Sequence, residues 1–169
     1  MNVLCVSGFG EEVQDDSKFW GIADALDSTA AVDLVVRRQW DTLAPADVAA
    51  ADVIIAYSYG QAALWHALAA FPPDQRPTIK HLFIIAGVPR FWWGQLYGTP
   101  WTIPANIQAA TCFNIDSIPA SCGIHNQCDR YVNISCRDRG LDHVSIQGDP
   151  IVRQTIIDAV RAMATEEAS

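Results

Sequence analysis

Short, uninterrupted runs of apolar residues rich in Val, Ile and Phe recur along this chain. Uninterrupted runs are typical of strands covered on both faces, as in a parallel sheet, because a strand with one wet face alternates apolar and polar residues. The pattern predicts six strands, at residues 2–7, 32–36, 52–58, 81–86, 111–115 and 131–135.

The segments between these runs carry helical patterns. Residues 19–26 place Phe, Ile, Ala and Leu along one helix face. A proline can open a short helix over 45–51, and residues 60–71 are apolar nearly all round, which predicts a buried helix. The last helix begins with Asp149 as N-cap and Pro150 in its first turn. Strands alternating with helices predict an α/β fold, a three-layer sandwich with about six mostly parallel strands.

Two segments interrupt this alternation. Residues 89–110 are rich in Trp, Gly and Pro, and residues 117–130 contain Pro, Cys and His. We expect one domain over residues 1–169, with 89–110 as a small cap-like insertion. Insertions of this kind often carry function.

A serine stands where the third predicted strand turns into a helix, in the stretch Ala56-Tyr57-Ser58-Tyr59-Gly60. Such a turn usually holds Gly, Asn, Asp or Pro. The stretch resembles the G-x-S-x-G nucleophile elbow of the α/β-hydrolase superfamily, with Ala56 in place of the first glycine. The elbow needs small residues on both sides because the chain turns sharply and holds the serine in a strained conformation. The alternative is an ordinary turn with a capping serine.

The resemblance implies a minimal member of that superfamily, similar to cutinase-like and lipase-like small serine esterases, with Ser58 as nucleophile. Family members place the base between the last strand and the last helix, where His143 lies. His66 and His81 fall in predicted regular elements and we interpret them as structural. His125 lies in the second interrupting segment.

The same resemblance implies that the acid follows the fifth strand, at Asp116, where the chain reads Asp-Ser-Ile-Pro. Three other carboxylates stay open as alternatives. Asp129 precedes His143 at a spacing similar to that of cutinases, and Asp138 and Asp142 lie nearer to the histidine.

An oxyanion hole needs two preorganised N–H donors. The resemblance implies the backbone amide of Tyr59, directly after the nucleophile, and an amide of the loop after the first strand. Phe9 is the candidate there, because the flanking Gly8 and Gly10 let its amide turn inward. The other interpretation of this loop is a glycine-rich tight turn. A dinucleotide site fits poorly because the third glycine of G-x-G-x-x-G is missing.

The first interrupting segment holds Trp92, Trp93, Tyr97 and Trp101. These rings either wall an apolar acyl pocket or seal a small core. The second segment contains Cys122, His125 and Cys128, and Cys136 follows the last strand. These four residues are of the types that bind metal ions. Their spacing is not a recognised zinc pattern, so we expect no metal. The alternatives are unpaired thiols or, in an exported protein, a Cys122–Cys128 disulfide.

Charge and composition restrict the kinds of partner and location that we expect for this protein. A net charge of −8 and a pI near 4.7 exclude the basic surface typical of nucleic-acid binding. The apolar runs are too short to span a membrane, and no secretory signal opens the chain, so we expect a cytoplasmic protein.

The function expected is hydrolysis of carboxylic esters of short-to-medium acyl chains, with a small-molecule ester as substrate and no cofactor. A thioesterase or small amidase would use the same triad. A non-catalytic binding protein with this fold is the remaining alternative, and the oligomeric state stays open.

Overall fold

The computed structural model describes residues 1–9, 18–87, 102–115, 125–126 and 128–167. Within this part of the chain, six strands form one sheet in the order β2-β1-β3-β4-β6-β8, and every neighbouring pair is parallel. This sheet confirms the predicted α/β class. The strands are β1 (Asn2–Val6), β2 (Leu34–Arg38), β3 (Val53–Tyr57), β4 (His81–Ile85), β6 (Ala109–Asn114) and β8 (Arg130–Ser135).

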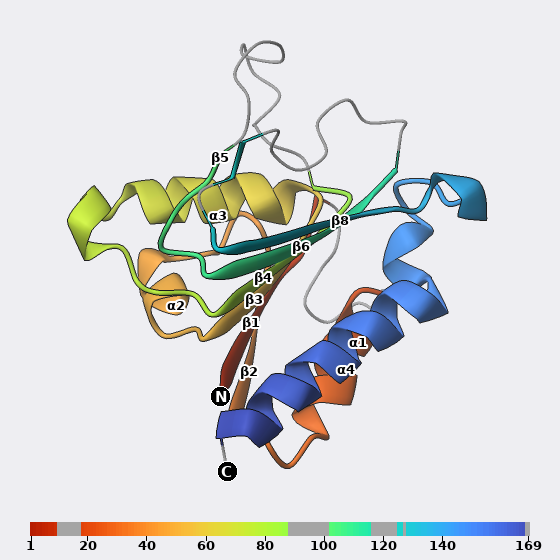
Figure 1. Cartoon of the computed structure of the whole chain (residues 1–169), viewed down its shortest axis with the longest axis horizontal. Coiled ribbons are helices and arrows are strands. Elements are labelled where there is room, and N and C mark those ends of the chain that lie inside the picture. Colours follow the sequence, from red (N-terminus) through yellow and green to blue (C-terminus); the bar gives the residue numbers. More distant parts are fainter. Residues whose placement is uncertain (10–17, 88–101, 116–124, 127, 168–169) are drawn as a thin grey trace.

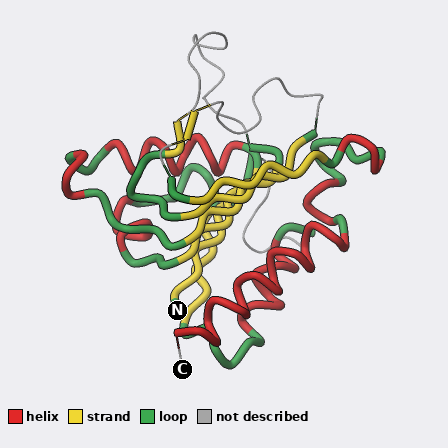
Figure 2. The backbone as a smooth tube through the Cα atoms, viewed as in Figure 1, coloured by secondary structure: helices red, strands yellow, loops and turns green. Residues whose placement is uncertain are grey.

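Helices cover both faces of the sheet (Figure 1). One face carries α1 (Trp20–Asp27) and α4 (Pro150–Glu167), and the other carries α2 (Pro45–Ala49) and α3 (Tyr59–Ala69). Figure 2 shows the same three layers, with the sheet in yellow between the red helices. In the described part of the chain, the 3-10 helices η1 (Pro73–Gln75), η2 (Arg137–Arg139) and η3 (Ile146–Gly148) join these elements.

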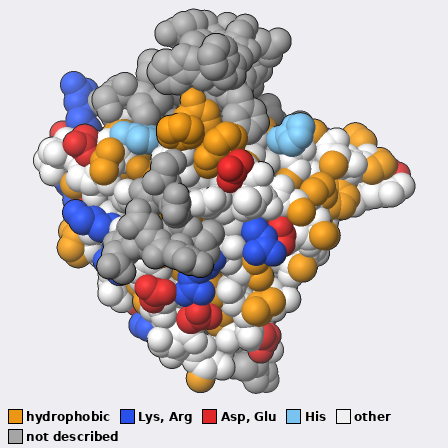
Figure 3. All heavy atoms as spheres, turned by 180° about the vertical axis from the view of Figure 1, so that it is seen from behind, with side chains coloured by type: hydrophobic (Ala, Val, Ile, Leu, Met, Phe, Trp, Pro, Cys, Tyr) orange, Lys and Arg blue, Asp and Glu red, His pale blue; other side chains and the backbone are white. Residues whose placement is uncertain are grey.

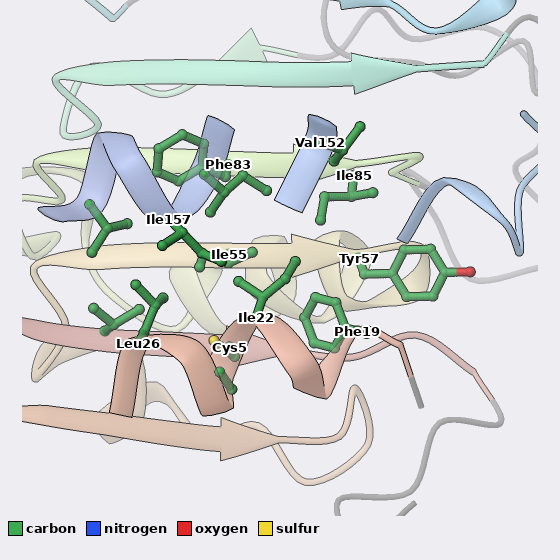
Figure 4. Close-up of a cluster of buried hydrophobic side chains, with 14 of the residues drawn as sticks. Cys5, Phe19, Ile22, Leu26, Ile55, Tyr57, Phe83, Ile85, Val152 and Ile157 are labelled. Atoms are coloured by element: carbon green, nitrogen blue, oxygen red, sulfur yellow. The ribbon is translucent and has the colours of Figure 1, made fainter. Parts of the chain in front are cut away.

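The two faces of the sheet pack into two separate cores. In β3, Ile55 and Tyr57 point into the core under α1 and α4, whereas Ile54 and Ala56 point into the core under α2 and α3. Figure 4 shows the first of these cores, with Tyr57 at the end of the cluster. Both faces of β3 are buried, so its apolar run is continuous rather than alternating.

The start of α4 has the predicted cap. The Asp149 carboxylate accepts hydrogen bonds from the amides of Ile151 and Val152, each at 2.9 Å, and pairs with Arg139. Burial alone would raise the pKa of this carboxyl, but the hydrogen bonds from Val152 and Arg139 outweigh it and hold the pKa below its usual range. The cap therefore anchors the end of the segment that leads from β8 to α4.

Strand β2 begins and ends two residues later than the sequence pattern predicts, at Leu34–Arg38 rather than 32–36. The reason is that two arginines extend this edge strand. Arg37 pairs with carboxylates of α1, and Arg38 pairs with Asp47 of α2. Their charges are paired with these carboxylates, so the two arginines can extend the strand beyond the apolar run from which it was predicted.

Within the described residues, each of the two segments that interrupt the alternation contributes a very short strand. β5 (Thr102–Ile103) pairs in parallel with β7 (His125–Asn126), apart from the main sheet. Residues 89–101 of the predicted cap-like insertion lie outside the described residues, and its last two residues begin β6.

The first turn of α3 lies directly against the end of β1. A Cβ atom at Gly60 would be 2.4 Å from the Val6 carbonyl oxygen and 2.9 Å from that of Ser7. Real Cβ contacts are not this short, and the atoms met are backbone, so only glycine fits here. The elbow glycine thus has a structural reason in this chain.

We expect Gly60→Ala to lower the free energy of unfolding by about 1–3 kcal/mol, because α3 must move away from β1. The matched control is Gly21→Ala in α1, where the new Cβ meets only the flexible end of Arg153. The free energy of unfolding of this control should equal or exceed that of the wild type, since alanine stabilises a helix relative to glycine by up to about 1 kcal/mol. Urea unfolding followed by circular dichroism measures both; equal stability of the two variants contradicts the close approach.

Candidate active site

The strand order reverses between β1 and β3. From β1 the sheet continues to β2 on one side, and from β3 it continues to β4 on the other. Loops leaving two such strands diverge to opposite faces, which opens a crevice at their carboxyl ends. Residues 7–9 leave β1 and Ser58 leaves β3 at this position.

Ser58 has a backbone conformation that L-residues rarely adopt, with φ 52° and ψ −123°. Its amide donates to the Ile85 carbonyl of β4 at 3.1 Å, and α3 begins at the next residue. The side chain is 4 % exposed. A strained serine between a buried strand and a buried helix is the local geometry that the elbow resemblance implies.

The hydroxyl of Ser58 lies 2.7 Å from Nε2 of His143. The two residues are 85 positions apart in the chain, and His143 comes from the segment between η2 and η3. A neutral imidazole accepts a hydroxyl proton at Nε2 only when its own proton is on Nδ1. The distance therefore fits a serine that donates to a neutral, Nδ1-protonated histidine.

Tyr57, directly before the serine, holds the histidine in place. Its hydroxyl donates to the backbone carbonyl of His143 at 2.8 Å, and its ring stacks on the imidazole with centroids 5.4 Å apart. The Tyr57 ring also stacks on Phe19, with centroids 5.6 Å apart. Sequence reasoning missed this role, although the strand alternation places Tyr57 on the face that α4 covers.

Hydrogen bonds between residues on either side of His143 close the turn that carries it. The Asp142 carboxylate accepts hydrogen bonds from the amides of Val144 and Ser145, at 3.1 and 2.6 Å. The Ser145 hydroxyl in turn accepts from the Asp142 amide at 2.9 Å. Asp142 is therefore engaged by its own turn, which disfavours it as the acid that orients the imidazole.

Nδ1 of His143 is buried and has no hydrogen-bond partner among the described residues. The predicted acid, Asp116, lies outside them, but Ile115 directly before it is buried at the carboxyl edge of the sheet, next to the end of β6. The alternative Asp129 is exposed and precedes β8, at the opposite edge. A strand of that length spans about 20 Å, so the fold disfavours Asp129.

The residues predicted to form an oxyanion hole border Ser58. Tyr59 is the first residue of α3, so its amide precedes the intrahelical hydrogen bonds. A Cβ at Gly8 would lie 2.6 Å from Cβ of Ser58 and 3.1 Å from its hydroxyl oxygen, which places the loop of Phe9 against the serine. Gly10 lies outside the described residues.

The aromatic residues and cysteines singled out in the sequence lie partly outside the described residues. Trp92, Trp93, Tyr97 and Trp101 all lie outside the described part of the chain, as does Cys122. Cys128 is buried in the core under α2 and α3, whereas Cys136 is buried in the core under α1 and α4. The sheet separates these two thiols, so they cannot bind one ion. No group of three or more metal-ligating side chains occurs within the described ranges.

Comparisons of the chain with models of protein families, with curated proteins and with solved structures gave no match.

Burial lowers the pKa of the His143 imidazole and the Asp142 carboxylate raises it; burial dominates, so the pKa lies below its usual value. We expect NMR titration of the His143 ring protons to give a midpoint below about 6.5. Asp142→Asn should lower the midpoint further, because the amide keeps the turn but loses the charge. His143→Gln assigns the resonance. A midpoint at or above about 7 would contradict the dominance of burial.

Proposed function

We propose that this protein is a serine hydrolase that cleaves carboxylic esters of short-to-medium acyl chains, as a minimal member of the α/β-hydrolase superfamily. The observation that carries the proposal is the 2.7 Å contact between the Ser58 hydroxyl and Nε2 of His143, at a serine whose φ is 52°. A capping serine needs neither the strained backbone nor a histidine partner. Both together favour a nucleophile with its base.

In the proposed reaction, Ser58 attacks the ester carbonyl while His143 takes the hydroxyl proton at Nε2. The negative oxygen of the tetrahedral intermediate accepts hydrogen bonds from the amides of Tyr59 and Phe9. His143 then gives its proton to the departing alcohol, which leaves an acyl group on Ser58. Water attacks that acyl group by the same proton transfers in reverse and releases the acid.

The arrangement of the elements favours this chemistry. Ser58 lies at the N-terminus of α3, an 11-residue helix whose dipole places about half a positive charge near the developing oxyanion. The serine, the loop of Phe9 and the switch between β1 and β3 all meet at one edge of the sheet, the usual ligand position in open α/β sheets.

The surface favours an uncharged substrate. Acidic and basic side chains are interspersed on the described part of the face in Figure 3, without a broad basic area there. The net charge of −8 disfavours anionic substrates at low salt. Among the described residues, no helix has the length and apolar composition to cross a bilayer. Thioesters and activated amides would react by the same steps.

We expect a fluorophosphonate probe to label the protein once, at Ser58. Ser58→Ala should abolish labelling and reduce hydrolysis of p-nitrophenyl butyrate by at least about a thousandfold, because the proposed acyl intermediate forms on the Ser58 hydroxyl. The matched control is Ser135→Ala, at the end of β8, which should keep both. Labelling that survives Ser58→Ala rules out the proposed nucleophile.

The acid is tested separately. Asp116→Asn should lower kcat by orders of magnitude, up to about ten-thousandfold, since an amide can favour the wrong histidine tautomer. Asp129→Asn should change kcat less than about twofold, because it lies at the opposite edge of the sheet. Circular dichroism checks that both variants fold. Equal losses, or the reverse order, would place the acid elsewhere.

A further inference from the structure

Three aromatic rings, those of Phe9, Trp40 and Tyr59, meet beside the candidate nucleophile. The ring centroids of Phe9 and Trp40 are 6.1 Å apart, those of Phe9 and Tyr59 are 6.2 Å apart, and those of Trp40 and Tyr59 are 6.0 Å apart. Phe9 is 73 % exposed and the other two are partly exposed. We call these three rings the aromatic cluster.

The sheet register brings the cluster together. The Ser7 amide donates to the Arg38 carbonyl at 2.9 Å, which extends the β1–β2 ladder by one step. Phe9 and Trp40 each follow two residues later, so the two loops continue side by side. Tyr59 joins them because it directly follows Ser58. The cluster thus lies at the carboxyl ends of β1, β2 and β3, and the reversal in strand order falls between β1 and β3.

The cluster and the histidine lie on different sides of Ser58. The cluster comes from the ends of β1, β2 and β3, and Tyr59 opens α3 on one face of the sheet. His143 follows β8 and stacks on Tyr57, which faces α1 and α4. In ester cleavage the departing alcohol must reach the histidine for its proton. The substituent that extends away from the histidine is the acyl group.

The charges near the cluster select a neutral acyl group. The Arg38 guanidinium donates to both oxygens of Asp47 at 2.8 and 2.9 Å, and Arg37 donates to Asp24 and Asp27 at 2.8 and 2.9 Å. Both cations are paired with carboxylates. The residue directly after Trp40, Asp41, is exposed and adds a negative charge. An anionic acyl group would therefore meet no uncompensated arginine at β2.

We propose that Phe9, Trp40 and Tyr59 form the acyl-binding surface of the site and that this surface prefers uncharged acyl groups bearing an aromatic ring. The inference rests on the proposed ester hydrolysis. Two aromatic rings whose centroids are about 4.5–7 Å apart attract each other more than burial of their surface alone explains. In the transition state this extra attraction corresponds to about a two- to tenfold increase in kcat/KM. An aliphatic ring of the same size gains the burial but not this attraction.

The experiment compares two p-nitrophenyl esters that differ only in the ring, the phenylacetate and the cyclohexylacetate. The measured quantity is the ratio of their kcat/KM values, and comparing this ratio between variants cancels their intrinsic reactivities. Trp40→Leu should lower the ratio about fivefold because it keeps apolar bulk without a ring. Trp40→Phe should retain most of the ratio.

Two further variants make the result decisive. Phe9→Leu changes the most exposed ring and keeps the backbone amide, so it should fold and also lower the ratio. Leu34→Ala is the control, since this exposed leucine lies at the other end of β2 and should leave the ratio unchanged. An unchanged ratio in both Trp40→Leu and Phe9→Leu overturns the proposed surface.

Failure of the surface and failure of the proposed function give different results. If the esters are cleaved but the ratio is insensitive to these variants, only the surface is wrong. If neither ester is cleaved and the fluorophosphonate probe does not label, the hydrolase function is wrong. The surface is then judged by calorimetric binding of the phenylacetate ester to Ser58→Ala protein, where adding Trp40→Leu should raise Kd about fivefold. An unchanged Kd overturns it.

Discussion

The contact between the first turn of α3 and the carboxyl end of β1 is the constraint on which the site depends. Because Gly60 lies against the backbone of β1, a side chain at this position has no room and the helix starts close to the sheet. The chain must then turn within one residue, and Ser58 takes the positive φ that this turn requires. Gly8, just after the end of β1, lies against the same serine, so the candidate nucleophile and the candidate oxyanion loop both depend on this close approach.

The two cores position different residues of the candidate site. The core under α2 and α3 fixes the turn at Ser58 through Ala56 and the start of α3. The core under α1 and α4 fixes His143, because Tyr57 stacks on both Phe19 and the imidazole. The candidate base is thereby held by a buried strand residue as well as by its own loop. Consecutive residues of β3 reach both cores, and Ser58 follows directly after them.

Much of this arrangement could be predicted from local sequence patterns, and the exceptions have physical reasons. The strands, the Asp149 cap and the turn at Ser58 depend on neighbouring residues, so periodicity and cap chemistry find them. The end of β2 was missed because compensating carboxylates on distant helices make Arg37 and Arg38 acceptable in a strand. The proximity of Trp40 to Phe9 depends on the β1–β2 register, which one sequence does not contain.

The strained backbone at Ser58 has both a structural cause and a proposed use. A residue held at such a positive φ costs about 1–3 kcal/mol and persists only where its surroundings enforce the conformation. The close approach of Gly60 to β1 enforces it here, because α3 must begin directly after β3 ends. The same conformation is the one that the proposed acyl transfer would use, since the Ser58 hydroxyl lies 2.7 Å from Nε2 of His143. Packing and the proposed chemistry therefore favour the same backbone conformation at this residue.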